Sequence, residues 1–121
     1  MSKPYNVVFI SVDTMRADHM GCYGYFRDTS PHMDALAAQG ALFTEAIAPH
    51  IPTQPSHTTF YTGLHAFAHK IAAHARSAKL DRQILMLPQI LQRHGYATAA
   101  VDSMVTISHG KGSWFARGYD Y

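Results

Sequence analysis

The chain has 121 residues, of which 47% are hydrophobic and 15% are charged. This composition is typical of a globular protein and excludes an intrinsically disordered one, and the length suffices for one domain with a core. The net charge of +2 comes from scattered residues and does not favour nucleic-acid binding. A single cysteine excludes an internal disulfide, and no run approaches the ~20 apolar residues of a membrane helix. Since the first apolar run is also too short for a signal peptide, we expect a cytoplasmic enzyme or binding domain without nucleic-acid or membrane partners.

Three short apolar segments are predicted to be strands. Residues 7–12 form a β-branched run bounded by Pro4 and Asp13, which is typical of a strand buried on both faces of a parallel sheet. The segments 41–46 and 96–101 are the second and third predicted strands.

Helices are predicted between these strands, after a glycine-rich polar stretch over residues 16–27. The first follows Ser30-Pro31, which supply an N-cap and a proline at the first helical position, and it stops at Gly40. A second is predicted from Thr53 to about residue 61, and a third over residues 88–94. Residues 64–83 are ambiguous and fit a loop with a short helix. The alternation predicts an α/β fold, with a mostly parallel sheet and helices on both faces.

Polar residues follow each predicted strand. Asp13 ends the first, Thr53 opens the helix after the second, and Asp102-Ser103 ends the third. Ligands of such sheets bind outside the carboxyl ends of the strands, and a helix N-terminus favours an anion. Taken singly, Asp13 fits a turn former and Thr53 fits a helix cap. Together they suggest a carboxylate that holds a cation beside a hydroxyl nucleophile.

The order of motifs along the whole chain resembles the sulfatases of the alkaline phosphatase superfamily. "PYNVVFISVDTMRADHMGCYG" is similar to the opening of these enzymes, and "SPHMDALAAQGALFTEAIA" to the segment that follows. "TQPSHTTFYTG" stands where the family carries its Cys-x-Pro-Ser-Arg motif, and "LPQILQRHGYATAAV" and "FARGYDY" resemble later segments. The resemblance implies that residues 1–121 are the N-terminal portion of an alkaline phosphatase-like catalytic domain whose remainder is absent from this chain.

The resemblance also implies roles for single residues. Asp13 would be a metal ligand, and Thr53, in the place of the cysteine, would be the nucleophile and a second ligand. Thr14 stands where the family has a second aspartate and is the weaker candidate ligand. Ser56 would support the helix start where substrate binds. The implied cofactor is a divalent metal ion, either Ca, Mn, Zn or Mg.

The departures from the family pattern bear on the chemistry. Sulfatases convert the motif cysteine, or in some members a serine, to formylglycine; Thr53 stands in that place and His57 stands at the arginine position. We therefore expect no formylglycine. Threonine nucleophiles occur in phosphatase and phosphodiesterase branches of the superfamily, so the expected substrate is a small-molecule phosphate or sulfate ester.

Several histidines admit two interpretations. His57 fits either an anion-binding or proton-transferring residue, or a first-turn histidine bonded to backbone. His69 falls where the family often has a histidine after Thr-Gly and is a candidate substrate-binding residue. With His65 and His74 it could also suggest a metal cluster, but the spacing lacks the pattern of structural zinc sites and favours a solvated loop.

Three functions remain open. The first is a metal-dependent hydrolase that acts through Thr53 and is incomplete in this fragment, which we expect to be inactive by itself. The second is a catalytically inactive N-terminal fragment serving as an anion-binding or interaction domain. The third, a flavodoxin-like nucleotide-binding domain, lacks a glycine-rich phosphate loop after the first strand. Because a partial sheet leaves edges unpaired, we expect self-association or pairing with the missing C-terminal part.

Overall fold

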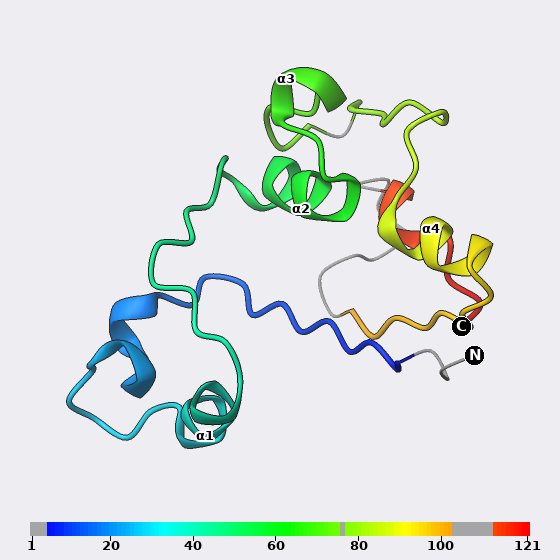
Figure 1. Cartoon of the computed structure of the whole chain (residues 1–121). Coiled ribbons are helices and arrows are strands. Elements are labelled where there is room, and N and C mark those ends of the chain that lie inside the picture. Colours follow the sequence, from blue (N-terminus) through cyan, green and yellow to red (C-terminus); the bar gives the residue numbers. More distant parts are fainter. Residues whose placement is uncertain (1–4, 76, 103–112) are drawn as a thin grey trace. The chain divides into compact units, whose positions relative to one another are not determined.

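The computed structural model describes residues 5–75, 77–102 and 113–121. The chain divides into two compact units, which are residues 1–46 and residues 47–121. Figure 1 labels the helices of both units. Within the described ranges, no helix combines the length and apolar character needed to cross a bilayer.

The first unit is organised around the start of helix α1. It contains the 3-10 turns η1 (Ala17–His19) and η2 (Gly21–Tyr23) and the helix α1 (Pro31–Gln39). The Asp34 carboxylate accepts hydrogen bonds from the Cys22 backbone N–H at 2.7 Å and from the Ser30 hydroxyl at 3.0 Å. The Ser30 oxygen in turn accepts from the Gly21 N–H at 3.0 Å. These bonds fasten η2 to the first turn of α1.

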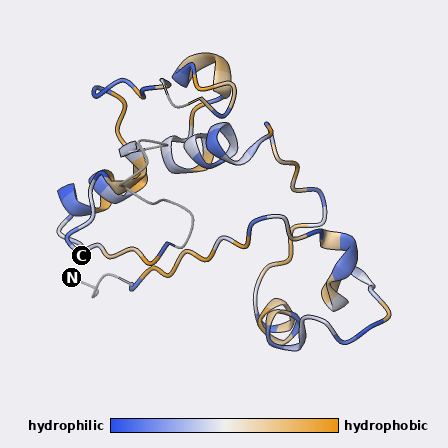
Figure 2. Ribbon diagram, turned by 180° about the vertical axis from the view of Figure 1, so that it is seen from behind, coloured by the Kyte–Doolittle hydropathy of each residue, from blue (hydrophilic) through white to orange (hydrophobic). Residues whose placement is uncertain are grey.

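The segment predicted as the first strand, residues 7–12, is exposed along its whole length in the first unit. Val8 is 81% exposed and Ile10 is 70% exposed. Figure 2 shows how much of this segment is hydrophobic. None of its residues is part of a strand in the described part of the unit, and a strand exists only where a neighbour completes its backbone ladder.

The second unit contains helices α2 (Thr53–Thr62), α3 (Ala66–His69) and α4 (Leu87–Arg93) and the 3-10 turn η4 (Ser113–Ala116). Its core consists of four buried side chains, namely Ile71, Leu80, Met86 and Trp114. Tyr61 of α2 and Phe115 of η4 pack against this core. The side chains that bury α2 therefore come from segments up to about sixty residues further along the chain.

The segment around Thr98 is tied to the C-terminal residues in the second unit. The Thr98 carbonyl accepts from the Asp120 N–H at 2.8 Å, and the Ala100 N–H donates to the Tyr121 carbonyl at 3.1 Å. The Asp120 carboxylate accepts from the Thr98 N–H and from the Gln92 side chain, both at 2.8 Å. Asp120 thereby joins this segment to the end of α4.

The helix predictions are confirmed and the sheet stays a prediction. Helices occur at 31–39, 53–62 and 87–93, within one residue of the predicted bounds, and α3 is the short helix expected between 64 and 83. The described residues of 7–12, 41–46 and 96–101 contain no strand. The α/β class with helices on both faces of a sheet therefore remains an expectation, since the ladder of a parallel sheet depends on partners distant in sequence.

Candidate functional site

The start of α2 carries the candidate nucleophile. Thr53 is the first residue of the helix and is partly buried. Pro52 occupies the N-cap position after a cis Ile51–Pro52 bond and has no side chain that can cap the helix. The Ser56 N–H closes the first turn by donating to the Pro52 carbonyl at 3.2 Å. Because the first amides of a helix point out of its N-terminus, a helix start without a capping side chain suits an acceptor such as an oxyanion.

His57 follows Thr53 by one helical turn, so the two residues share a face of α2. Its ring lies 4.7 Å from the Phe60 ring and 6.1 Å from the Phe115 ring, measured between centroids. The contact with Phe115 is edge-on, which is a favourable arrangement of aromatic rings. These two rings hold the partly buried imidazole on the nucleophile's side of the helix.

A chain of buried polar groups underlies the first turn of α2. The Trp114 indole N–H donates to the Thr58 hydroxyl at 3.1 Å, and that hydroxyl donates to the Gln54 carbonyl at 2.8 Å. The Gln54 side-chain oxygen accepts from the Ala75 N–H at 3.0 Å. Thr58 and Gln54 are 0% and 4% exposed, so these bonds are shielded from water. The backbone next to Thr53 is thus held by two distant segments.

His69, the candidate substrate-binding residue, is 2% exposed at the end of α3. Its Nδ1 accepts from the Ile71 N–H at 3.0 Å, so the proton sits on Nε2, which lies 3.1 Å from the Thr59 hydroxyl oxygen. Burial lowers the pKa of His69, and the nearby His50 and His65 lower it further. The ring is therefore neutral and joins α3 to α2. Its role toward substrate stays a prediction.

Asp13 and Thr14, the candidate metal ligands, belong to the first unit and are exposed. The Thr14 N–H donates to the Asp13 carboxylate at 2.8 Å. Thr14 has φ = +62°, a left-handed conformation that is an outlier for a β-branched residue. Strained backbone of this kind gathers at ligand sites, so the outlier agrees with a function at this position.

The described residues do not by themselves make a metal site. Asp13, Thr14 and Thr53 offer one carboxylate and two hydroxyls, oxygen donors of the kind that hard cations prefer. Across 5–75, 77–102 and 113–121, however, no three His, Cys, Asp or Glu side chains are grouped so that they could hold a metal ion. The expectation of a solvated loop for these histidines is wrong for His69, which is buried at the end of α3, whereas His65 and His74 are exposed. A divalent ion at Asp13 would need further donors.

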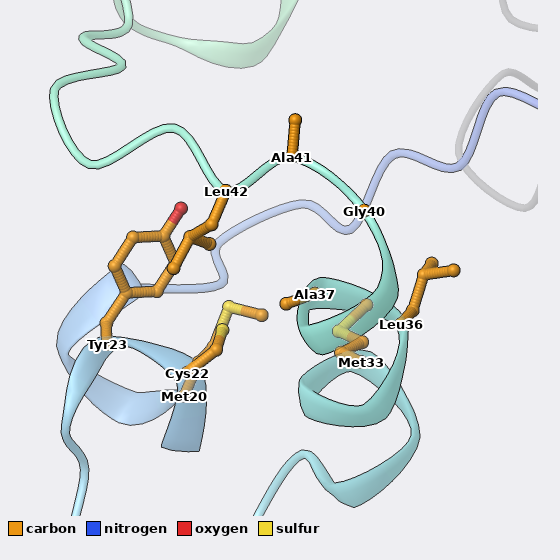
Figure 3. Close-up of a pocket in the computed structure, with 9 residues that line it drawn as sticks. All are labelled: Met20, Cys22, Tyr23, Met33, Leu36, Ala37, Gly40, Ala41 and Leu42. Carbon is orange, nitrogen blue, oxygen red and sulfur yellow. The ribbon is translucent and has the colours of Figure 1, made fainter.

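A hollow of about 370 Å³ lies in the first unit between η2 and α1. Figure 3 shows Met20 and Cys22 reaching toward Ala37 and Met33 of α1. The wall of this hollow is mostly apolar. The other residues that line it are Tyr23, Leu36, Gly40, Ala41 and Leu42. Burial and the Asp34 carboxylate raise the pKa of the Cys22 thiol, which does not favour a reactive thiolate.

The sequence did not reveal the residues that support the first turn of α2. Gln54 is a variable position of the motif, and Trp114 stands sixty residues away with no pattern to connect the two. The signal that was present is the single tryptophan, whose N–H needs a partner when buried. Asp102 lies at the edge of the described residues, and Ser103 lies outside them.

Comparison with known proteins gives one family. The model of the sulfatase family matches residues 5–121. N-acetylgalactosamine-6-O-sulfatase of Bacteroides thetaiotaomicron is 30% identical, over 83% of this chain and 20% of the relative. Human arylsulfatase D is 31% identical over 79% of this chain and 18% of the relative, and mouse steryl-sulfatase is 31% identical over 82% and 17%. The chain thus spans about a fifth of the length of these relatives. No solved structure gives a significant match.

Proposed function

This chain belongs to the sulfatase family, and from that premise we propose that it contributes the nucleophile to a hydrolase of sulfate or phosphate esters. The observation that carries the proposal is the position of Thr53. It is the first residue of α2, it follows an N-cap without a capping side chain, and it shares a helix face with His57. The relatives' names describe sulfatases of sugars and of aryl and steryl groups, which supports a sulfate ester as substrate.

In the proposed reaction, the Thr53 hydroxyl oxygen attacks the sulfur or phosphorus atom and the ester oxygen leaves. A new bond forms between the threonine oxygen and the sulfuryl or phosphoryl group, the hydroxyl proton passes to a base, and water later releases the group.

The helix start would bind the equatorial oxygens, with Ser56 closing the turn beneath them. His57 is proposed to contact the anion or to accept the proton. His69 is proposed to support substrate binding from α3. Because residue 53 is a threonine, no formylglycine is expected.

The experiment is the Thr53→Ala substitution, assayed by release of p-nitrophenol from phosphate and sulfate esters with added divalent metal. We expect turnover to fall by several orders of magnitude, because a missing nucleophile leaves only binding and electrostatics. Thr62→Ala at the other end of the same helix is the matched control and should retain most of the activity. Equal turnover in Thr53→Ala and in Thr62→Ala would contradict the assignment.

Sulfatases use a divalent metal ion, and we propose Asp13 as one of its ligands, with Thr14 and Thr53 as the further candidate ligands. Calcium, manganese, zinc and magnesium are the candidates. When bound, the ion would lower the pKa of a coordinated hydroxyl and screen the charge of the ester. Asp13→Asn should weaken metal binding measured by calorimetry while the circular dichroism spectrum stays unchanged, and Asp28→Asn serves as the control. Unchanged affinity in Asp13→Asn would remove Asp13 from the ligand set.

One observation favours the alternative, an N-terminal portion that acts through interaction and is itself inactive. The apolar run 7–12 is exposed in the first unit, and exposed runs of this kind favour association. Self-association, or pairing with a chain that carries further sulfatase sequence, would cover it. Sedimentation at increasing concentration tests this, with Val8→Lys as the comparison. A monomer at every concentration, together with ester hydrolysis, would dispose of the alternative.

A further inference from the structure

Gln54 is held from two sides in the second unit. Its side-chain oxygen accepts from the Ala75 N–H at 3.0 Å, twenty-one residues along the chain. Its backbone carbonyl accepts from the Thr58 hydroxyl at 2.8 Å, which receives the Trp114 indole N–H at 3.1 Å. One residue of the first turn of α2 is therefore anchored both to the 71–75 segment and to η4.

The burial of Gln54 is costly. The side chain is 4% exposed, and its Nε2 has no hydrogen-bond partner among the described residues. A buried donor without a partner lowers stability, whereas a methionine of similar shape would fill the same space without that cost. A glutamine is therefore suited to this position by the bond that its oxygen makes to Ala75.

That bond acts on the residue next to it. Thr53 precedes Gln54 directly, and the Ser56 N–H closes the same turn on the Pro52 carbonyl. The position of the Thr53 hydroxyl follows the backbone of this turn, since the residue is the first of the helix. A displacement of ~1 Å at a reacting group can reduce a rate about 100-fold.

We propose that Gln54 is a positioning residue for Thr53, which it fixes through the Ala75 N–H on one side and through Thr58 and Trp114 on the other. This inference rests on the proposed function of Thr53 as the nucleophile. Gln54 does not touch the reacting atoms. Its effect is to hold the backbone of the first turn of α2 in place, so that the Thr53 hydroxyl keeps a fixed position relative to an ester bound at the helix start.

The test compares Gln54→Met with Gln89→Met. Gln89 makes the same kind of bond at the start of another helix, where its side-chain oxygen accepts from the Met86 N–H at 3.1 Å. Both substitutions thus remove a glutamine-to-backbone bond in a helix first turn, but only one adjoins Thr53. Thr58→Val breaks the second anchor while it preserves the side chain's shape, and it gives an independent variant if Gln54→Met does not fold.

The activity measurement is kcat and KM for p-nitrophenyl phosphate and sulfate, with divalent metal added. We expect kcat to fall at least fivefold in Gln54→Met and in Thr58→Val while KM changes less than twofold, and both constants to stay near the parent values in Gln89→Met. Equal kcat in Gln54→Met and Gln89→Met, with Thr53→Ala inactive, would overturn the positioning role and leave the nucleophile in place.

Hydrogen exchange at the Ser56 amide separates the two proposals. If Thr53→Ala stays active, the nucleophile assignment fails, and if the parent hydrolyses neither ester, turnover does not bear on that assignment. In both cases exchange alone decides the role of Gln54. We expect exchange at Ser56 to quicken at least tenfold in Gln54→Met and to remain unchanged in Gln89→Met. Unchanged exchange at Ser56 in both variants would show that Gln54 does not fix this turn.

Discussion

The two units are stabilised in different ways, although both are rich in apolar residues. The second unit buries Ile71, Leu80, Met86 and Trp114 together, and its candidate nucleophile stands on a helix anchored to this core. In the described part of the first unit, 5–46, no large apolar side chain is buried, and the buried residue is Ser30. Hydrogen bonds around Asp34 organise that unit instead. The comparison teaches that apolar content does not by itself make a core, which requires segments that can meet.

The largest expected effect is the loss of the second unit's core in Trp114→Ala. The side chain is 2% exposed and donates to Thr58, so truncation leaves a cavity and an acceptor without its donor. We expect a loss of about 3–5 kcal/mol in the free energy of unfolding. Urea unfolding followed by far-UV circular dichroism measures this loss of stability. Tryptophan fluorescence cannot serve as the probe, because the substitution removes the single tryptophan.

Val8→Ala in the first unit is the control for that prediction. Val8 is exposed, so its truncation should change the free energy of unfolding by no more than about 0.5 kcal/mol. A loss in Val8→Ala comparable to that in Trp114→Ala would break the comparison, because it would mean that residues 7–12 pack against a partner in solution.

The next effect concerns the polar contacts of the first unit. A Cβ added at Gly21 would lie 2.3 Å from a carboxylate oxygen of Asp34, so Gly21→Ala must displace that side chain. The Cys22 N–H and the Ser30 hydroxyl then lose their acceptor, at a cost of about 1–2 kcal/mol. Amide exchange over residues 17–39 should quicken while that of the second unit does not change.

Gly40→Ala is the matched control at the other end of α1. The nearest atom to a Cβ there is the Leu36 carbonyl oxygen at 3.4 Å, which is ordinary contact. Equal exchange in Gly21→Ala and Gly40→Ala would show that the Asp34 contacts do not hold the first unit together.

The sequence predicted local structure better than long-range structure for a physical reason. Ser30-Pro31 and Gly40 are helix boundaries read from conformational preference, and they stand where the pattern placed them. The start of α2 at Thr53 was predicted as well, but Thr53 fitted the helix cap in the sequence, and Pro52 occupies that position in the structure. The Trp114–Thr58–Gln54 chain was missed, because hydrogen bonds between residues far apart depend on tertiary packing. Strand pairing is equally non-local, and so the sheet expected from the alternation of segments stays a prediction.

The third prediction is a pH dependence confined to the second unit. Burial holds the pKa of His69 below its ordinary value, so the unfolded chain takes up a proton there at a higher pH than the folded chain. The stability from the neutral ring is complete above about pH 6.5, and it is lost as the pH falls through 6.5 toward the lower folded pKa. Protonation also breaks the bond from the Ile71 N–H to Nδ1.

Urea midpoints between pH 7.5 and pH 5 measure this dependence. His69→Gln should flatten the decline, whereas the exposed His32→Gln, on α1 of the first unit, should keep the parent slope. A slope that survives His69→Gln unchanged would assign the dependence to another group.

The smallest expected effect is a gain in the first unit. Thr14 holds φ = +62°, where a β-branched residue is strained and asparagine is tolerated far better. Thr14→Asn should therefore raise the stability of the first unit by about 1 kcal/mol or less, measured as slower amide exchange near residues 13–19. Thr44→Asn, at a residue of the same unit without a positive φ, should bring no gain in stability.

If the strain serves metal binding, the stabilised variant will also bind a divalent ion more weakly in calorimetry, because the turn beside Asp13 relaxes. Stability and affinity that both rise in Thr14→Asn would mean that the left-handed turn is not part of the site.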